Sequence, residues 1–341
     1  MKILLVSADR TTRSGHPQNI GDALLTDALA EALGVAGHDV RVADLAPERR
    51  ADGSVARIPV PGLAGLRRAV AAADAVIIGG GTLLADDQPQ RLFAGLPRLC
   101  LTTSLLAVLH RKKLAVFGVG VDPVGRRRAR AAIRLVLHSA AVWVRDADSA
   151  GRASRFLGGR SVRVSGDVSL SARAEIAARA IPASDREGVV VALNRREAAL
   201  LRPEDVERLR SRHGSVRFLS MDQGVDADST HLAHDVAREL SVVEGPVPWT
   251  RAVAEIAGAE AVVASRMHAM YVACMVSVPV VAVGDAPKVR TFVGDFGVAH
   301  ATGVSEACST EPRTEAARTD AQTARLSEAM KELEEWLDAA H

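Results

Sequence analysis

The stretch Val262–Lys288, which reads VVASRMHAMYVACMVSVPVVAVGDAPK, constrains the fold of this chain more than any other segment. Its β-branched start, together with Ala261, is typical of a buried parallel strand. The apolar run stops at Ser265-Arg266-Met267-His268, an Ala/Met/Val-rich helical segment follows, and a second apolar run occupies Val278–Val283. A strand, a helix and a second strand in this order predict an α/β fold with a parallel sheet.

The turn between the first strand and the helix predicts an anion site. Ser265 is expected to be the N-cap, which places Arg266 and His268 in the first helical turn. Free N–H groups and the positive end of the helix dipole attract an anion, and Arg266 adds a two-pronged donor. Lys288 follows the second strand, and ligands of open α/β sheets bind at the carboxyl ends of strands, so the three side chains are expected to converge. The alternative is an ordinary polar helix start.

Strands and helices alternate along the whole chain in two successive series. This pattern favours two doubly wound, Rossmann-like halves that face a cleft. Strands are predicted at 2–7, 40–45, 74–78, 114–119, 141–144 and 162–165, and again at 189–193, 216–219, 261–264 and 278–283. Helices are predicted between them, among others at 63–73, 90–110, 126–138, 203–213, 228–240 and 248–258. A length of 341 residues fits two domains. We assign residues 1–170 to the first, 171–187 to a linker, 188–312 to the second and 313–341 to a C-terminal helix that packs back.

Composition excludes several classes of function. A net charge of +2 gives no reason to expect nucleic acid as a partner. The three cysteines are widely spaced, without a metal-binding pattern, and suit a reducing compartment. No apolar run reaches the ~20 residues that span a bilayer, so no membrane insertion is expected. The apolar start of the chain is too short for a signal peptide, and we expect a cytoplasmic protein.

Two glycine-rich turns and several polar residues follow predicted strands. Gly79-Gly80-Gly81-Thr82 either cradles a phosphate or forms a tight turn with close backbone packing. Gly118-Val-Gly120 lacks the third glycine of a dinucleotide fingerprint, which argues against NAD. Asn19 is expected to cap a helix, with Asp22 three residues later. Asp22 and Asp167 lie at strand-to-helix turns, where they act either as bases toward an acceptor hydroxyl or, the favoured interpretation, as caps.

Taken in order, these segments resemble the polysaccharide pyruvyl transferase family. The resemblance rests on Asn19-Ile-Gly21-Asp22, Gly79-Gly80-Gly81-Thr-Leu83, Gly118-Val-Gly120 with Pro123, Arg145-Asp146 with Ser149, Gly166-Asp167, Ser265-Arg266-Met-His268 and Pro287-Lys288-Val289 with Phe292. It implies a two-domain fold like the GT-B glycosyltransferases, phosphoenolpyruvate as donor, and a sugar or related hydroxylated metabolite as acceptor. The product would be a cyclic pyruvate ketal, with the acceptor on the N-terminal domain and the donor on the C-terminal one. No cofactor and no metal are implied beyond phosphoenolpyruvate as co-substrate.

The same resemblance implies the donor-site residues Arg145, Arg266, His268 and Lys288. Three cationic side chains match the carboxylate and phosphate of phosphoenolpyruvate. His268 and Arg266 are the expected catalytic residues: His268 delivers a proton to the terminal methylene carbon, and the arginines and the helix N-terminus stabilise the departing phosphate. Further substrate-binding candidates are Ser265, Asn19, Asp22, Gly80, Gly81 and Asp167.

Two other functions share these features. A GT-B glycosyltransferase would use the same basic site for the diphosphate of a nucleotide sugar. A non-catalytic homologue would keep the ligand site without turnover, although a fold alone requires none of Arg266, His268 and Lys288. The identity of the acceptor and the oligomeric state are left open by the sequence.

Overall fold

The computed structural model describes residues 1–12, 15–45, 55–88, 94–243 and 245–339. Contacts divide the chain into two compact units, each of which contains one parallel sheet. Unit 1 consists of Met1–Arg10, Leu24–Ser171 and Thr323–His341, and unit 2 consists of Thr11–Ala23 and Ala172–Gln322. The cleft expected between the two units stays a prediction.

Unit 1 holds a seven-stranded parallel sheet in the order β3-β2-β1-β4-β5-β6-β7. The strands are β1 (Lys2–Val6), β2 (Asp39–Asp44), β3 (Arg57–Pro59), β4 (Ala75–Gly79), β5 (Lys113–Val119), β6 (Ala141–Val144) and β7 (Arg163–Val164). The central strands β1, β4 and β5 are almost wholly buried, as continuous apolar sequences such as AVIIG require when helices cover both faces. The order reverses between β1 and β4, which makes the sheet doubly wound.

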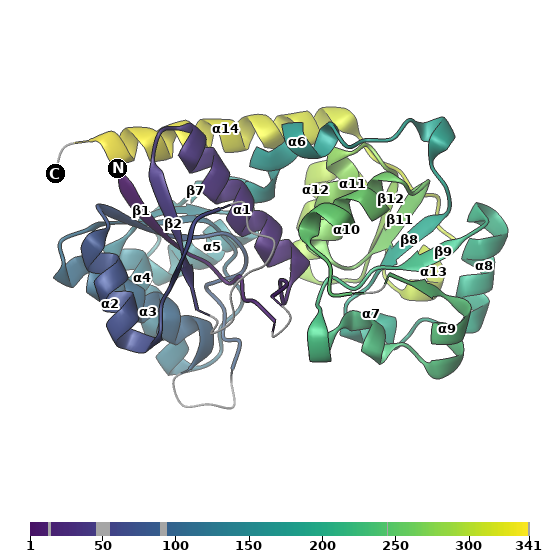
Figure 1. Ribbon diagram of the computed structural model, residues 1–341, viewed down its shortest axis with the longest axis horizontal. Coiled ribbons are helices and arrows are strands. Elements are labelled where there is room, and N and C mark those ends of the chain that lie inside the picture. Colours follow the sequence, from purple (N-terminus) through teal and green to yellow (C-terminus); the bar gives the residue numbers. More distant parts are fainter. Residues whose placement is uncertain (13–14, 46–54, 89–93, 244, 340–341) are drawn as a thin grey trace. The chain divides into compact units, whose positions relative to one another are not determined.

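The helices of unit 1 cover both faces of its sheet (Figure 1). They are α1 (Ile20–Val35), whose first turn belongs to unit 2, α2 (Gly62–Ala72), α3 (Gly95–Leu109), α4 (Arg127–Ser139), α5 (Ala147–Phe156) and most of α14 (Ala316–Asp338). The side chain of Lys113 donates to the carbonyl oxygen of Leu337 (2.7 Å), and Trp336 lies edge-on against Trp143 with ring centroids 6.2 Å apart. The C-terminal helix therefore packs back on the sheet, as predicted.

Unit 2 holds a six-stranded parallel sheet in the order β10-β9-β8-β11-β12-β13. Its strands are β8 (Val189–Ala192), β9 (Val216–Phe218), β10 (Ser241–Val242), β11 (Ala261–Ala264), β12 (Val280–Val283) and β13 (Ala299–Ala301). Its helices are α6 (Arg173–Ala177), α7 (Arg195–Ala198), α8 (Pro203–His213), α9 (His234–Glu239), α10 (Trp249–Ala257), α11 (Met267–Met275), α12 (Pro287–Phe296) and α13 (Val304–Ala307). The reversal between β8 and β11 confirms a second doubly wound sheet and hence the predicted α/β fold class.

One predicted helix, 228–240, is wrong. The segment forms a 3₁₀ turn, Asp228–His231, and then α9, with Leu232 and Ala233 extended between them. The carboxylate of Asp228 accepts hydrogen bonds from the backbone N–H groups of Met221 (3.0 Å) and Asp222 (3.1 Å), and these tertiary bonds outweigh helical propensity. The predicted helix 90–110 is observed from Gly95, and 90–93 lie outside the described residues.

The described residues contain no helix that is long and apolar enough to cross a membrane, and no cluster of three or more His, Cys, Asp or Glu side chains that could hold a metal ion. Cys100, Cys274 and Cys308 are free and buried. Burial raises the pKa of each thiol to about 12, so none of the three is a reactive thiolate at neutral pH.

Candidate active site

The loops after β8 and β11 are tied together at the point where the order of the unit 2 sheet reverses. The backbone N–H groups of Ser265 and Arg266 both donate to the carbonyl oxygen of Ala192, at 3.1 and 3.2 Å. The hydroxyl of Ser265 accepts from the N–H of Asn194 (2.9 Å) and is not the N-cap of α11, so that prediction was wrong. The N-cap is Arg266, whose backbone is extended. Open α/β sheets bind ligands at such a reversal.

Arg266 is held by two carboxylates. Its Nε donates to Oδ2 of Asp228 (3.0 Å), and its Nη2 contacts Oδ1 of Asp228 and Oδ2 of Asp222. The side chain of Asp228 is 0% exposed. Burial alone would lower the pKa of Arg266, but the hydrogen bonds and charges of Asp228, and then of Asp222, raise it. One guanidinium and two carboxylates leave this group, which we call the Arg266 cluster, with one net negative charge.

The segment before α1 joins the Arg266 cluster through Asn19. Asn19 Nδ2 donates to Oδ1 of Asp222 (2.5 Å), and the N–H of Ile20 donates to the carbonyl oxygen of Met221 (2.9 Å). The side-chain oxygen of Asn19 accepts from the N–H of Asp22 (2.9 Å), which confirms that Asn19 caps the helix. A single amide side chain therefore fixes the start of α1 and one carboxylate of the cluster.

His268 lies in the first turn of α11, packed between a glycine and an aromatic ring. A Cβ atom on Gly21 would lie 1.9 Å from Nδ1 of His268, so the imidazole rests against the backbone of α1. The ring also stacks on Tyr271, with centroids 6.1 Å apart and planes at 29°. Tyr271 is held in turn by edge contacts with Phe292 and Phe296. The orientation of His268 at the helix N-terminus is thus set from both sides.

Lys288 and Glu197 lie at the same edge of the unit 2 sheet. Lys288 is the second residue of α12, the helix that follows β12, and its side chain is exposed. Because β11 and β12 are adjacent and parallel, their carboxyl ends meet at one edge. Glu197, in α7 after β8, places its Oε1 3.6 Å from the position of a Cβ on Gly284, the residue that follows β12.

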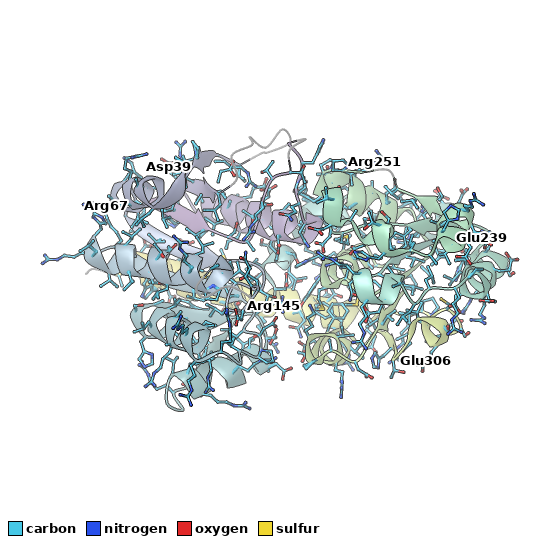
Figure 2. The ribbon with its side chains drawn as sticks, turned by 90° about the horizontal axis from the view of Figure 1, so that it is seen from below. Asp39, Arg67, Arg145, Glu239, Arg251 and Glu306 are labelled. Atoms are coloured by element: carbon cyan, nitrogen blue, oxygen red, sulfur yellow. The ribbon has the colours of Figure 1, made fainter. Side chains whose placement is uncertain are left out.

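Arg145, in unit 1, is also paired with two carboxylates. It is buried, its Nε donates to Oδ2 of Asp146 (3.1 Å), and its Nη1 lies 3.9 Å from Oδ2 of Asp167. Asp146 caps α5 by accepting from the N–H of Ser149 (2.7 Å). Burial raises the pKa of Asp146, but the charge of Arg145 and the bonds from Ser149 outweigh it and lower the pKa. Arg145 is labelled among the side chains in Figure 2.

The triple-glycine turn packs against the second glycine-rich turn. Gly80 and Gly81 have φ values of +75° and +70°, which favour glycine. The carbonyl oxygen of Gly81 accepts from the N–H of Gly120 (2.9 Å), and a Cβ on Gly120 would lie 3.0 Å from Nη2 of Arg145. Of the two uses left open by the sequence, close backbone packing is observed, and phosphate binding stays a prediction.

Comparison with known proteins decides the family. A family model described as polysaccharide pyruvyl transferase matches residues 19–286, which include Asn19, both glycine turns, Arg145 and the Arg266 cluster. The chain belongs to the polysaccharide pyruvyl transferase family. No curated protein matches it.

Solved structures share the fold of this family member at low sequence identity. UDP-GlcNAc 2-epimerase from Methanocaldococcus jannaschii is 12% identical, with a TM-score of 0.61, over 98% of this chain and 100% of that one. The Neisseria meningitidis UDP-GlcNAc 2-epimerase bound to UDP-GlcNAc is 13% identical, with a TM-score of 0.54, over 100% and 95%. A glycosyltransferase from Rickettsia africae is 11% identical, with a TM-score of 0.54, over 96% and 91%. These similarities confirm a GT-B-like fold.

The predicted site residues of this pyruvyl transferase family member fall into two groups. Unit 2 brings together Asn19, Ser265, Arg266 and His268, with Asp22 in the first turn of α1 and Lys288 at the same sheet edge. Unit 1 brings together Gly80, Gly81, Arg145 and Asp167, whose carboxylate also accepts from the N–H and hydroxyl of Ser169. The convergence of Arg145 with the unit 2 residues stays a prediction, as do the roles of all these residues.

Sequence reasoning missed Asp222 and Glu197. Asp222 lies four residues after β9, and the predicted strand 216–219 already placed an acidic residue near the carboxyl end of a strand. The position of Asp222 after a predicted strand was the signal that could have identified it as a site residue. No such signal points to Glu197, since it lies in a charged four-residue helix whose sequence is typical of a surface turn.

Replacing Gly21 with alanine is expected to destabilise unit 2. The added methyl group would overlap the imidazole of His268 and force it off Tyr271, a cost of about 1–3 kcal/mol for overpacking. Gly34→Ala is the matched control in the same helix, because a Cβ there meets nothing within 4 Å. Thermal melts should show a lower Tm for Gly21→Ala and an unchanged or slightly higher Tm for Gly34→Ala. Equal melting temperatures for Gly21→Ala and the unsubstituted protein would contradict the packing described.

Proposed function

We propose that this protein transfers the pyruvyl group of phosphoenolpyruvate to hydroxyls of a glycan precursor or related hydroxylated metabolite, as a cyclic ketal, in the cytoplasm. The observation that carries the proposal is His268, which is held between Gly21 and Tyr271 at the N-terminus of α11 beside the Arg266 cluster. Membership of the polysaccharide pyruvyl transferase family supports the class of reaction.

The donor would bind beside the positive groups at the sheet edge of unit 2. The N–H groups at the start of α11 and the ammonium of Lys288 suit the carboxylate and phosphate of phosphoenolpyruvate. The Arg266 cluster carries net negative charge, so Arg266 would act mainly by positioning Asp222, Asp228 and the helix N-terminus. Arg145 is the remaining donor-site candidate, from unit 1.

The chemistry needs one proton donor and one cation-stabilising group. His268 would deliver a proton to the terminal methylene carbon of the donor, which becomes a methyl group as positive charge develops at C2. The adjacent Arg266 cluster, with its net negative charge, would stabilise that developing cation. An acceptor oxygen then bonds to C2 and loses its proton, phosphate leaves from the tetrahedral adduct, and a second hydroxyl closes the ketal with loss of its own proton.

The choice of donor can be tested by thermal shift. A ligand at a hundred times its Kd stabilises by ~2.7 kcal/mol, and each kcal/mol moves the Tm by about 2–4 °C. We expect phosphoenolpyruvate to raise the Tm and UDP- and GDP-sugars to leave it unchanged. Lys288→Gln should reduce the shift, whereas Lys331→Gln, on the exposed surface of α14, should not. A shift with a nucleotide sugar alone would replace the proposal with a GT-B glycosyltransferase, a shift with phosphoenolpyruvate without turnover would favour a non-catalytic homologue, and no shift with phosphoenolpyruvate would contradict the proposal.

A further inference from the structure

Three successive helices of unit 1 carry positive charge and no negative charge. The sequences of α2, α3 and α4 contain no aspartate or glutamate, and they hold two, one and four arginines respectively. These are Arg67, Arg68, Arg98, Arg127, Arg128, Arg130 and Arg134, all with exposed side chains. Seven arginines without a counter-charge on three helices stand out in a chain whose net charge is only +2.

The same three helices expose large apolar side chains. Within the described part of the chain, nine large hydrophobic residues are prominently exposed, and five of them lie on these helices. They are Leu63 on α2, Leu105, Val108 and Leu109 on α3, and Leu135 on α4, each between 54% and 68% exposed. Because α3 packs against both α2 and α4, the five residues and the seven arginines share one layer, which we call the α2–α4 face. Arg67, on this face, is labelled in Figure 2.

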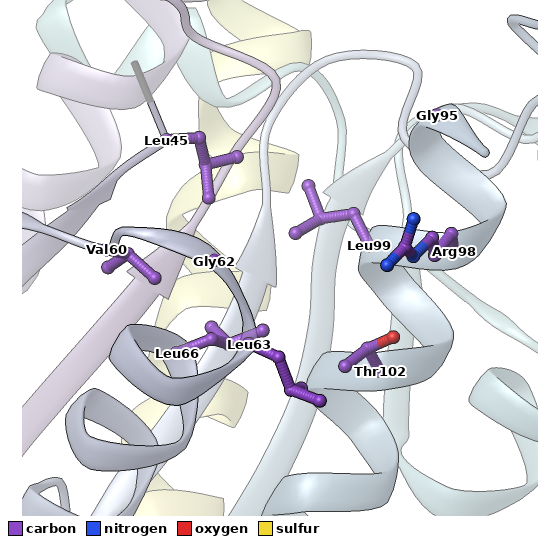
Figure 3. A pocket seen from close by; sticks show the side chains of 9 residues that line it. All are labelled: Leu45, Val60, Gly62, Leu63, Leu66, Gly95, Arg98, Leu99 and Thr102. Carbon is purple, nitrogen blue, oxygen red and sulfur yellow. The ribbon is translucent and has the colours of Figure 1, made fainter. Parts of the chain in front are cut away.

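An apolar pocket of about 440 Å³ opens between α2 and α3. Figure 3 shows Leu63 and Leu66 of α2 on one side and Leu99 and Thr102 of α3 on the other, with Arg98 close by. Arg98, Leu105 and Leu109 are 7 and 11 residues apart, so they share one side of α3. Arg98 lines the pocket and also begins a stripe along α3 that continues with the apolar side chains of Leu105 and Leu109.

The arginines of the α2–α4 face differ from those of the candidate active site. Arg145 and Arg266 each engage two carboxylates, whereas no carboxylate in the described ranges forms an ion pair with any of the seven arginines. Exposed cations without partners attract anions, and exposed leucines gain free energy only where they leave water. A ligand for this face must offer both a negative surface and an apolar interior.

We propose that the α2–α4 face binds the surface of an anionic lipid bilayer. The arginines would lie among the lipid phosphates while Leu105, Leu109 and Leu135 enter the boundary between headgroups and acyl chains. The pocket between α2 and α3 would accept part of an acyl chain. Nucleic acid would pair with the arginines and leave the leucines in water. The inference does not depend on the reaction proposed above.

Vesicle co-sedimentation tests this binding. The full chain is mixed with vesicles of phosphatidylcholine alone or of phosphatidylcholine with phosphatidylglycerol. We expect binding to the anionic vesicles only, weakened by salt. Each arginine near the surface should contribute about fivefold in affinity, so Arg128→Gln together with Arg134→Gln should weaken binding about 25-fold. Leu105→Asp together with Leu109→Asp should abolish it.

Two matched controls lie in unit 2. Leu200→Asp changes a leucine of similar exposure, and Arg196→Gln removes an exposed arginine, and both should leave vesicle binding intact. Thermal melts of all variants check folding. Equal binding to neutral and anionic vesicles, no binding to either, or equal loss in the control variants would overturn the proposal. Concentration-dependent dimerisation that is lost in Leu105→Asp with Leu109→Asp, without vesicle binding, would assign the face to a second copy of the chain instead.

Discussion

Replacing His268 with glutamine is expected to lower the rate of pyruvyl transfer by about 10²–10⁴-fold, the usual contribution of a positioned general acid. Glutamine keeps a polar side chain of similar length against Gly21 and Tyr271 but carries no titratable proton. Binding of phosphoenolpyruvate should change little, since helix N–H groups and Lys288 remain. The measurement is the initial rate of phosphate release with donor and acceptor, beside donor titration by thermal shift.

His234→Gln is the matched control for this substitution. His234 is an exposed histidine in the same unit, at the start of α9, and it lies outside the Arg266 cluster. Its replacement should leave the rate unchanged. If His268→Gln transferred pyruvate as fast as His234→Gln, His268 could not be the acid. If it lost donor binding instead, its role would be to hold the donor.

Asp228→Ala is expected to lower the free energy of unfolding by about 3–5 kcal/mol, because it breaks a buried ion pair from one side. The side chain of Asp228 is fully buried, so its loss leaves Arg266 with Asp222 alone. It also removes the acceptor of the Met221 and Asp222 N–H groups, which shape the loop after β9. The midpoint of urea denaturation, followed by tryptophan fluorescence, measures the change.

Asp226→Ala controls for removal of a neighbouring carboxylate. The side chain of Asp226 is half exposed, and its Oδ1 lies 3.9 Å from Nη1 of Arg195, which is also half exposed. Such surface pairs contribute about 0–1 kcal/mol, so the midpoint should hardly move. Asp228→Asn retains an acceptor oxygen but not the charge. Its denaturation midpoint should lie between those of Asp228→Ala and Asp226→Ala. Equal midpoints for Asp228→Ala and Asp226→Ala would mean that the Arg266 cluster does not stabilise unit 2.

The fold was predictable where the sequence carries long patterns. The runs that became β4 and β11 are apolar throughout, and those that became β1 and β5 are apolar apart from the lysine at their start. By contrast, β3, β10 and β13 have only two or three residues, too few for a period to be visible. The helix predicted over 228–240 failed because the N–H groups of Met221 and Asp222, in the loop after β9, donate to the carboxylate of Asp228, and helix propensity does not include such bonds.

The candidate site was predictable in part for the same reason. His268 and Arg266 stand in a local motif at the end of a strand, and their helical position follows from sequence spacing. Asp222 belongs to the site because its carboxylate accepts hydrogen bonds from Asn19, 203 residues away in sequence, and from Arg266, 44 residues away. Contacts between distant segments leave no periodic trace in a single sequence. The pairing that neutralises the charge of Arg266 was therefore absent from the prediction.

The interleaving of the two units has a consequence for synthesis of the chain. Unit 1 includes Thr323–His341, which the ribosome makes after all of unit 2, and unit 2 includes Thr11–Ala23, which it makes before most of unit 1. No single cut in the chain separates the units. During translation, β1 to β7 must wait for α14 to cover Trp143, and residues 11–23 must wait for Asp222 and His268. The apolar surface that α14 covers in unit 1 therefore stays exposed while unit 2 is being made, and such transient exposure favours aggregation.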